Sequence, residues 1–322
     1  MSSHREHAFA LLSKDLMALR LSSDPSRESH QLRAKAVIAS ILLLSYLEVH
    51  WPTSGAWLMH LDGALRMEAI VQLATFNDAT AFFLTEELFT ASTWPLLTRF
   101  NSQPTFIIYD SELDGKWSLG RMHRPVSVFT PFLSILREIT RIERQYCETV
   151  NDPGYQLHLR RVFEEVQLNL TQAHKSAVDA LRSQLVIHPT SHAEDMKHLI
   201  DAYFYSTKIY SYRALVHFEF DPNSLRSMRG RLLDALLAFQ NPDSFAQDQP
   251  WPLFVVGVES IDDVSSQHWV EHRMNRVIQL YCSIDRPRML CFLRAFWAQK
   301  GQRNWISFAR KWTKDYFEFL VL

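Results

Sequence analysis

Apolar residues recur at steps of three and four between Pro153 and Pro189, which is the spacing of one face of an α-helix. This stretch therefore predicts one long amphipathic helix. A second run, over residues 193–220, repeats the spacing. Pro189 separates the two runs, so we expect two antiparallel neighbouring helices. The residues that carry the pattern are Leu159, Phe163, Val166, Leu170, Ala173, Ala177, Leu181 and Leu185 in the first run, and Met196, Leu199, Tyr203, Tyr210 and Ala214 in the second.

The rest of the chain divides into further helical segments at breaks rich in proline and serine. Glycine, which all-β and doubly wound folds need for their turns, supplies only 8 of the 322 residues. We therefore expect an all-α fold of antiparallel helices, either as one domain over residues 1–322 or as two halves, 1–124 and 125–322. The further helices are expected near residues 4–20, 29–50, 55–73, 78–98, 126–150, 223–239, 262–281, 286–299 and 303–320.

The longest irregular stretch covers residues 101–124 and includes residues 105–109, which could form a lone short strand. A stretch of this length is either a functional loop or an excursion over the surface, and the sequence leaves both interpretations open.

Charge and composition exclude several classes of protein. The chain has 34 Lys and Arg against 35 Asp and Glu, with 47% hydrophobic and 21% charged residues. These values are typical of a folded globular chain and not of a disordered one or an electrostatic nucleic-acid binder. The most apolar stretch, residues 37–47, is much shorter than the roughly 20 residues of a membrane span. We expect no membrane segment, and the polar residues 1–7 do not resemble a targeting signal.

The sequence contains no glycine-rich phosphate loop and no G-x-S-x-G hydrolase motif. Its strongest enzyme-like pattern is His268-Trp-Val-Glu271-His272. Two histidines four residues apart on one helix face can bind zinc, with Glu271 as general base on a zinc-bound water. A third ligand would have to come from a downstream carboxylate such as Asp285, Asp315 or Glu318. The alternative is a solvated helix face on which Glu271 pairs with Arg273 or Asn275. We favour this alternative and predict no metal, cofactor or catalytic residue.

Three further histidines, His188, His192 and His198, lie around a proline-containing turn. Ser191 fits the N-cap of the following helix, with Glu194 three residues later, so the local sequence needs no metal to explain it.

The remaining histidine and cysteine candidates also fit structural roles. We expect His60 to be a buried helix contact, with Gly63 allowing close approach of a neighbouring helix. Cys282 and Cys291 have apolar sequence neighbours and are predicted to be inert core thiols, whereas Cys147 precedes a glutamate that disfavours the thiolate. Three cysteines also exclude a disulfide framework and any site of four thiolates within the chain.

A basic stretch near the C-terminus contains interleaved aromatic residues and no acidic ones. It could form a nucleic-acid groove with stacking platforms, or two amphipathic helices with solvated basic faces. Trp305, Phe308 and Trp312 recur at steps of three and four, which favours the helices. The basic residues are Arg286, Arg288, Arg294, Lys300, Arg303, Arg310, Lys311 and Lys314.

Several short motifs then resemble, in order, the regulatory domain of fungal zinc-cluster transcription factors. An apolar helix ends in Tyr46-Leu-Glu48, and the pattern W-x-x-H-L-x-G-A follows as Trp57-Leu-Met-His60-Leu-Asp-Gly63-Ala64. The segment Tyr210-Ser-Tyr-Arg213-Ala-Leu-Val-His217 is similar to the tyrosine-rich helix of the family.

The strongest resemblance lies in the last third of the chain. Trp251-Pro-Leu-Phe-Val-Val-Gly257-Val-Glu259 resembles the W-P-L-F-x-x-G signature of the family, and a helix with Arg273 and Arg276 follows it. Leu293-Arg-Ala-Phe-Trp297 then resembles L-R-x-x-W, and Trp305 matches the next family tryptophan. The resemblance implies that residues 251–254 are an apolar plug between helices and that Gly257 allows close packing.

This resemblance implies an all-α regulatory domain of a nuclear, non-enzymatic transcriptional regulator, often of a metabolic pathway or a biosynthetic gene cluster. The family normally carries an N-terminal DNA-binding zinc cluster of six cysteines, which three cysteines cannot supply. Either the chain acts through protein partners or a DNA-binding subunit, with a small-molecule effector, or the segment that encodes the zinc cluster is missing from this sequence. On either account we doubt direct DNA binding. The alternatives are a metal-dependent enzyme or accessory protein of a biosynthetic pathway that uses His268, Glu271 and His272, and an interaction scaffold unrelated to transcription.

Overall fold

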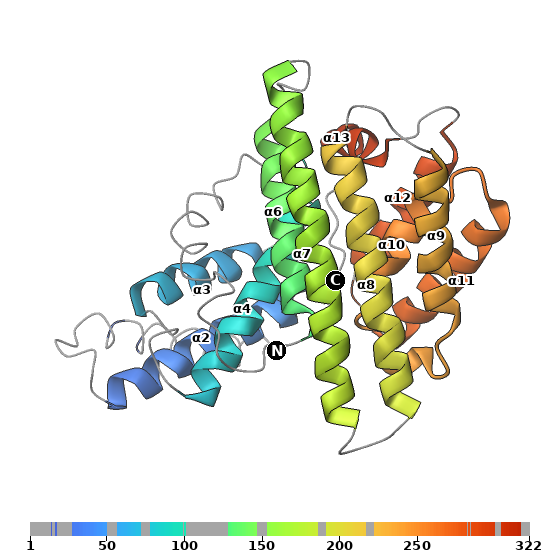
Figure 1. Cartoon of the computed structure of the whole chain (residues 1–322). Helices are drawn as coiled ribbons and strands as arrows, with labels where there is room; N and C mark the ends of the chain where they lie inside the picture. Colours follow the sequence, from blue (N-terminus) through green and yellow to red (C-terminus); the bar gives the residue numbers. More distant parts are fainter. Residues whose placement is uncertain are drawn as a thin grey trace. The chain divides into compact units, whose positions relative to one another are not determined.

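The computed structural model describes residues 14, 17, 28–49, 57–71, 78–98, 100, 128–146, 153–185, 191–216, 222–281, 283, 285–299 and 304–316. Over these residues the chain is helical and has no strand, which confirms the all-α prediction (Figure 1). The helices are α2 (Glu28–Val49), α3 (Trp57–Val71), α4 (Ala79–Thr98), α6 (Thr130–Tyr146), α7 (Pro153–Leu185), α8 (Ser191–Leu215), α9 (Pro222–Leu237), the 3-10 turn η3 (Pro242–Phe245), α10 (Pro250–Val258), α11 (Val264–Leu280), α12 (Asp285–Trp297) and α13 (Trp305–Asp315).

Each described helix from α2 onward lies close to its predicted range, except α10, where the sequence analysis expected an apolar plug and no separate helix. The predicted helix near 4–20, apart from Lys14 and Met17, and the predicted strand at 105–109 lie outside the described residues. None of the described helices combines the length and the apolar character that a membrane span requires.

The chain divides into two compact units, residues 1–92 and 93–322, and the division falls within α4. The alternative division that we predicted, near residue 125, lies outside the described residues and stays a prediction.

The N-terminal unit contains α2, α3 and the first part of α4. Helix α2 buries Val37, Ile38 and Ile41, and it packs against α3, which buries Leu61 and Ala64. A Cβ added at Gly63 would meet no described atom within 4 Å. The predicted close helix approach at Gly63 is therefore wrong for the described part of this unit. His60, one turn earlier, is half-buried.

The C-terminal unit is built around the pair α7 and α8. His174 on α7 lies 2.6 Å from Asp201 on α8, and Gln167 donates to Ser211 at 2.8 Å. The residue nearer the start of α7 thus contacts the residue nearer the end of α8. The two helices are therefore antiparallel, as predicted (Figure 1). Helix α7 has 33 residues and is therefore about 50 Å long.

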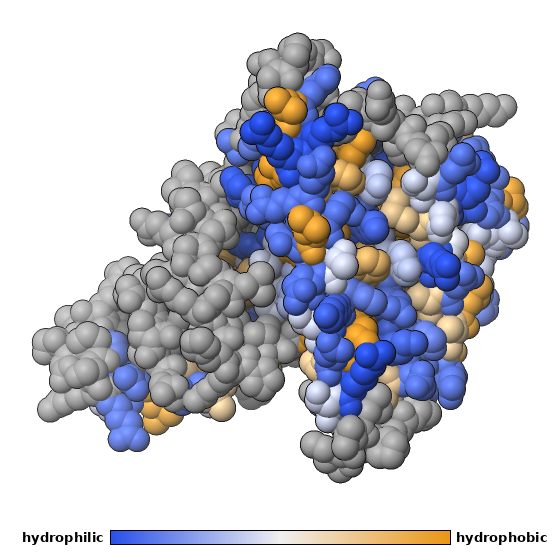
Figure 2. Space-filling view, viewed as in Figure 1, coloured by the Kyte–Doolittle hydropathy of each residue, from blue (hydrophilic) through white to orange (hydrophobic). Residues whose placement is uncertain are grey.

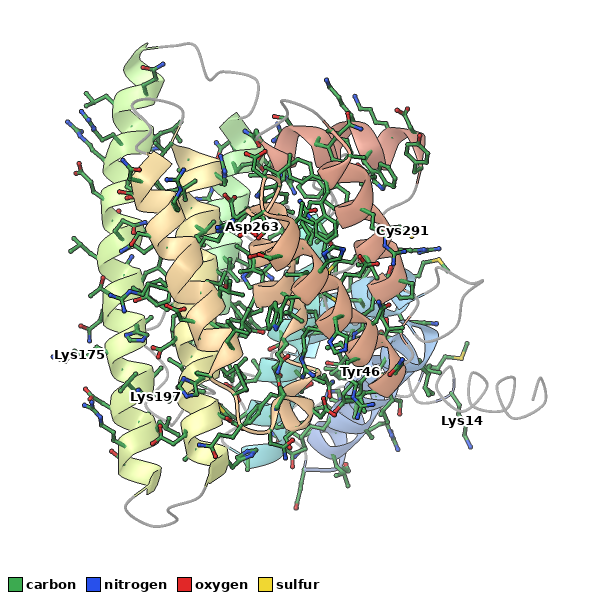
Figure 3. The ribbon with its side chains drawn as sticks, turned by 90° about the vertical axis from the view of Figure 1, so that its right-hand side faces the viewer. Lys14, Tyr46, Lys175, Lys197, Asp263 and Cys291 are labelled. Carbon is green, nitrogen blue, oxygen red and sulfur yellow. The ribbon has the colours of Figure 1, made fainter. Side chains whose placement is uncertain are left out.

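The surface of the C-terminal unit in Figure 2 is mainly hydrophilic over α7 and α8, with scattered hydrophobic side chains. Leu157 and Leu168 of α7 are of this kind, with exposed fractions of 54% and 72%. Lys175 and Lys197, labelled in Figure 3, extend from α7 and α8 into solvent. Single exposed leucines are normal on a soluble helix and do not by themselves mark an interface.

Candidate functional site

Helix α10 is the most deeply buried of the described helices in the C-terminal unit. All nine residues of Pro250–Val258 are buried, and α8, α9, α11 and α12 pack around them. Pro250 and Pro252 lie in the first turn, where a missing N–H removes no helical hydrogen bond. A helix that is apolar on every side is stable only inside a core. The resemblance-based expectation of an apolar plug is therefore met by a short helix.

Four aromatic side chains at α10 pack in a ring, so that each contacts two of the others. We call them the aromatic cluster: Tyr210, Trp251, Phe254 and Trp305. The ring of Trp251 is perpendicular to that of Tyr210 at 5.4 Å between centroids, and the ring of Trp305 is nearly perpendicular to that of Phe254 at 5.2 Å. Tyr210 also contacts Trp305 at 5.9 Å, and Trp251 contacts Phe254 at 6.2 Å. Edge-to-face contacts of this kind add to the free energy of area burial. The cluster therefore joins α8, α10 and α13.

Gly257 determines how closely α10 approaches its neighbours. A Cβ built on Gly257 would lie 2.9 Å from Leu293 Cδ2 on α12 and 3.3 Å from Val270 Cγ1 on α11. The indole N–H of Trp297 donates to the Gly257 carbonyl oxygen at 2.8 Å. The expected role of this glycine in close packing is therefore confirmed, and Leu293 and Trp297 of the L-R-x-x-W motif both meet α10 at this residue.

Arginine–carboxylate pairs surround α10. Arg213 on α8 donates to both carboxylate oxygens of Glu259, at 2.7 and 2.6 Å, directly after the end of α10. Arg229 on α9 pairs at 3.1 Å with Asp263, the N-cap residue of α11. The Glu259 carboxylate is 5% exposed, and a bidentate pair of this geometry fixes orientation as well as charge.

Two arginines of α11 hold the 3-10 turn that precedes α10. Arg273 and Arg276 donate to the two carboxylate oxygens of Asp243 on η3, at distances of 2.6 to 2.9 Å. These hydrogen bonds, first from Arg276 and then from Arg273, lower the pKa of the Asp243 carboxyl to about 2. Arg273 also donates to Gln249 Oε1 at 2.8 Å, immediately before α10. The two arginines therefore set the position at which α10 begins.

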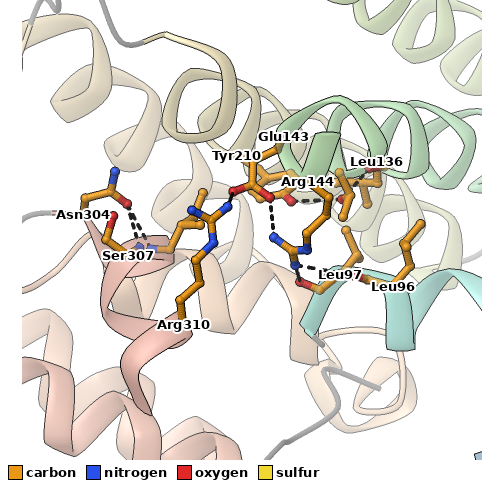
Figure 4. Close-up of polar contacts among 11 residues, drawn as sticks. Leu96, Leu97, Leu136, Glu143, Arg144, Tyr210, Asn304, Ser307 and Arg310 are labelled. Atoms are coloured by element: carbon orange, nitrogen blue, oxygen red, sulfur yellow. Dashed lines mark hydrogen bonds and ion pairs between the residues drawn. The ribbon is translucent and has the colours of Figure 1, made fainter. Parts of the chain in front are cut away.

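A buried carboxylate connects α6 with the last described helix (Figure 4). Glu143, 5% exposed, accepts hydrogen bonds from Arg144 beside it and from Arg310 on α13. Arg144 also donates to the backbone oxygens of Leu96 and Leu97, in the last turn of α4, at 3.5 and 3.4 Å. Two arginines thus share one carboxylate, and the negative C-terminal end of the α4 dipole offsets part of the excess positive charge at Arg144.

The Tyr210 hydroxyl of the aromatic cluster shares a 2.9 Å hydrogen bond with the Thr140 hydroxyl on α6, the helix that carries Glu143. Burial, followed by the negative charge of Glu143, raises the pKa of Tyr210 to about 12. Tyr210 therefore stays a neutral phenol, and it connects the aromatic cluster to the ion pairs.

A family model described as a fungal specific transcription factor domain matches residues 1–317. The chain belongs to the fungal-specific transcription factor domain family. Comparison with curated proteins gives no match, and neither does comparison with solved structures. No six-cysteine zinc cluster is found within the matched residues, in keeping with three cysteines in all. The family motifs of the C-terminal unit form α10 or lie on the elements around it, and we call this arrangement the α10 hub: Tyr210, Arg213, Trp251, Phe254, Gly257, Glu259, Arg273, Arg276, Leu293, Arg294, Trp297 and Trp305. The two earlier family motifs lie on α2 and α3 of the N-terminal unit.

The H-x-x-E-H pattern of this family member lies on α11, outside the hub core. His268 and His272 are exposed, and Glu271 accepts a hydrogen bond from Arg294 Nε at 2.9 Å. The predicted pairing of Glu271 with Arg273 or Asn275 is therefore wrong, because its partner is Arg294 of the next helix. Among the described residues, no three His, Cys, Asp or Glu side chains form a group able to hold a metal ion.

Neither of the two described carboxylates considered as a third ligand joins these histidines. Asp285 is buried and pairs with Arg288 at 3.6 Å, Asp315 is exposed on α13, and Glu318 lies outside the described residues.

The described histidines around residue 190 contact aromatic side chains. His192 stacks on Phe245 with ring centroids 4.6 Å apart, and His198 packs against Phe239 at 6.1 Å. His188 lies outside the described residues.

The prediction that Cys291 is a core thiol is wrong, because its side chain is exposed (Figure 3). Its neighbours Leu290 and Phe292 are buried, but a helix turns by about 100° per residue, and the turn at Cys291 faces solvent. Cys147 and Cys282 lie outside the described residues.

The basic stretch from residue 286 to 314 is only partly solvated. Arg286 is buried and donates to the Tyr281 carbonyl oxygen at 3.0 Å, while Arg294 and Arg310 pair with Glu271 and Glu143. The prediction of solvated basic faces is therefore wrong for Arg286, which is buried, and for Arg310, which is half-buried, whereas Arg294 is exposed as predicted. The aromatic side chains of the stretch pack against each other, as their spacing predicted: Phe292, Phe296, Phe308 and Trp312.

Sequence reasoning did not identify Glu143 and Arg144 as part of the site. Arg310, which pairs with Glu143, is 167 residues away in the chain. A charged pair on an amphipathic helix also carries no signal that it will be buried. Arg213 and Glu259 lie in motifs that the sequence analysis quoted, but their pairing follows only from the packing of α8 against α10.

Proposed function

We propose that this chain is the regulatory part of a nuclear transcriptional regulator of a biosynthetic gene cluster or metabolic pathway. It acts through protein partners and not as an enzyme. Membership of the fungal-specific transcription factor domain family over residues 1–317 supports the regulatory role. The observation that carries the proposal is that the family motifs of the C-terminal unit meet at α10 through packing and ion pairs, in an arrangement that suits transmission of structural change.

The proposed mechanism is mechanical coupling through the α10 hub. Close-packed cores respond to displacement by moving between discrete arrangements, since they cannot deform continuously. Gly257 leaves no room between α10 and the side chains of Leu293 and Val270. A shift of α10 would therefore move α11 and α12, and through Trp305 also α13. A partner protein or a small-molecule effector that shifts any of these helices would change the surface that the others present.

We assign DNA contact to a partner protein or a DNA-binding subunit, because the three cysteines of this chain cannot build the six-cysteine zinc cluster. The chain would then reach its target genes only in a complex inside the nucleus. Microscopy of a fluorescent fusion tests the location, and isolation of the tagged chain with its bound proteins identifies the partner.

A tethered reporter tests the regulatory role directly. The full chain is fused to a DNA-binding module from an unrelated protein, and expression of a reporter gene beside the cognate DNA site is measured. We expect the fusion to change reporter expression at least fivefold. Gly257→Val, which forces the hub open, should abolish this effect at equal protein level. Gly230→Ala is the matched control, because a Cβ at Gly230 meets no described atom within 4 Å.

A deletion strain separates regulation from the enzymatic alternative. A regulator predicts that a defined set of transcripts falls silent, and that the chain with His268→Ala and His272→Ala restores them. Unchanged transcripts with accumulation of a pathway intermediate, together with loss of about one equivalent of zinc in that double variant, would instead establish the metalloenzyme.

A further inference from the structure

Helix α2 has apolar side chains on two opposite sides. Its inner side packs against α3 in the N-terminal unit. Its outer side carries Leu32, Leu43 and Leu47, whose exposed fractions are 66%, 62% and 65%. A helix that is apolar all round is normally covered on every side. Within the described part of this unit, the outer side of α2 therefore lacks a covering element.

Five residues form a continuous stripe along this side, and we call the stripe the outer face of α2. At 100° per residue they lie within an arc of about 80°, and at 1.5 Å per residue they extend over about 22 Å. None of the five is charged. They are Leu32, Ala36, Ser40, Leu43 and Leu47.

The contacts of α2 with the beginning of α4 leave this face open. Lys35 pairs with Asp78 at 3.0 Å, and the Tyr46 hydroxyl donates to Glu87 at 2.9 Å. Lys35 and Tyr46 both lie about 80–100° round the helix from Ala36, on the same side. These polar contacts are therefore at one edge of the outer face and not across it.

The exposed leucines of α7 have a different setting. Leu157 and Leu168 are separated on their helix face by the exposed charged residues Arg161 and Glu164. A face of that kind is suited to solvent. An uninterrupted apolar stripe is instead typical of a surface that binds another protein.

The order of large and small side chains on the outer face matches a second copy of itself in the antiparallel orientation. With a two-fold axis between residues 39 and 40, Leu32 lies opposite Leu47 of the second copy. Leu43 then lies opposite the small Ala36 of the second copy, so large side chains meet small ones near the axis and the helices can approach to about 8 Å. A face that matches itself under a two-fold rotation is what an isologous dimer interface requires. A helix of a different protein would not require this match.

We propose that the outer face of α2 is the interface of a two-fold symmetric dimer of this chain, in which the two α2 helices are antiparallel. A single helix face about 22 Å long buries less than the roughly 800 Å² per partner of a standard interface. We therefore expect a reversible dimer with a dissociation constant in the micromolar range. This inference goes beyond the proposed function, because it uses the N-terminal unit and does not involve the α10 hub.

Sedimentation velocity on the full chain measures this association. The concentration is varied from about 1 to 100 µM, under reducing conditions so that the exposed Cys291 cannot link two copies. We expect the monomer to convert to a dimer over this range. Leu43→Glu should raise the dissociation constant at least tenfold, because it places a carboxylate against an apolar surface of the second copy. Leu168→Glu on α7 is the matched control, because it changes a leucine of similar exposure and should leave the dissociation constant unchanged.

A charge pair tests the antiparallel orientation. Ala36→Lys alone should also weaken the dimer, because the lysine faces Leu43 of the second copy. Combined in one chain with Leu43→Glu, it should give a dimer at least fivefold tighter than either single variant, because each new lysine then faces the new glutamate of the other copy. The two positions are seven residues apart, too far to pair within one helix. Both are exposed, so circular dichroism should show the parent helix content in every variant.

Three results would overturn the proposal. The first is a chain that stays monomeric at every concentration, in which case another part of the chain, solvent or a different protein covers the outer face. The second is a dimer that Leu43→Glu leaves intact, which would place the interface elsewhere. The third is a double variant that associates no more tightly than the single variants, which would exclude the antiparallel match.

Discussion

Gly257 offers the sharpest test of the α10 hub. In Gly257→Ala, the new methyl group would lie 2.9 and 3.0 Å from the two terminal carbons of Leu293 and 3.3 Å from Val270 Cγ1. Both neighbouring side chains are fully buried, so neither can move into solvent to relieve the overlap. Overpacking of this kind costs roughly 1–3 kcal/mol. Alanine in a helix is about 0.5–1 kcal/mol more favourable than glycine, which offsets part of that cost.

The net expectation is a loss of about 1 kcal/mol in the free energy of unfolding, within a range of roughly 0–2.5 kcal/mol. Urea unfolding of the full chain, followed by tryptophan fluorescence, measures it. Gly230→Ala provides the comparison, because its methyl group meets no described atom within 4 Å. That variant should gain about 0.5–1 kcal/mol from helix propensity alone. The two glycine-to-alanine changes therefore have opposite signs.

A third variant identifies the neighbour responsible. Combining Gly257→Ala with Leu293→Ala removes the side chain that the new methyl group would overlap, so the cost of the first change should nearly vanish in that background. If Gly257→Ala is as stable as the parent, or if Leu293→Ala leaves its cost unchanged, the close approach at Gly257 is not what positions α10.

Other features of the C-terminal unit lead to further predictions. Glu143→Gln leaves two arginines around a neutral amide and should cost about 3–5 kcal/mol, whereas Arg310→Met leaves Glu143 paired with Arg144 and should cost about 1 kcal/mol, measured by thermal or urea unfolding. The pKa of the Asp243 carboxyl is lowered from 3.8 to about 2, so its ion pairs stabilise the fold above pH 4 and are lost as the pH falls to about 2. In Asp243→Asn, the free energy of unfolding should therefore depend less on pH over this range. Cys291 is exposed, so a maleimide should modify it in the native chain within minutes, and protection until denaturation would contradict its placement.

The sequence determined the fold class and most helix positions of this protein. Apolar residues at steps of three and four on α7 and α8, bounded by prolines, can bury a continuous face only as helices, and this holds whatever those faces pack against. Motifs such as Trp251-Pro-Leu-Phe, Gly257 and Leu293-Arg-Ala-Phe-Trp297 could be identified because their residues lie close together in the chain. The resemblance to the family followed from the order of these motifs, and the family model over residues 1–317 confirms it.

Only the tertiary structure decided which partner each polar side chain meets. Glu271 looked like part of a metal site because two histidines flank it, yet Arg294 of the next helix pairs with it. Glu143 meets Arg310 across 167 residues of chain, and Cys291 is exposed although its neighbours in sequence are buried. Periodicity records which face of a helix is apolar, but charge pairing depends on distances between helices that no local pattern contains. The site is therefore visible in the sequence as motifs, and its network of contacts only in the packed unit.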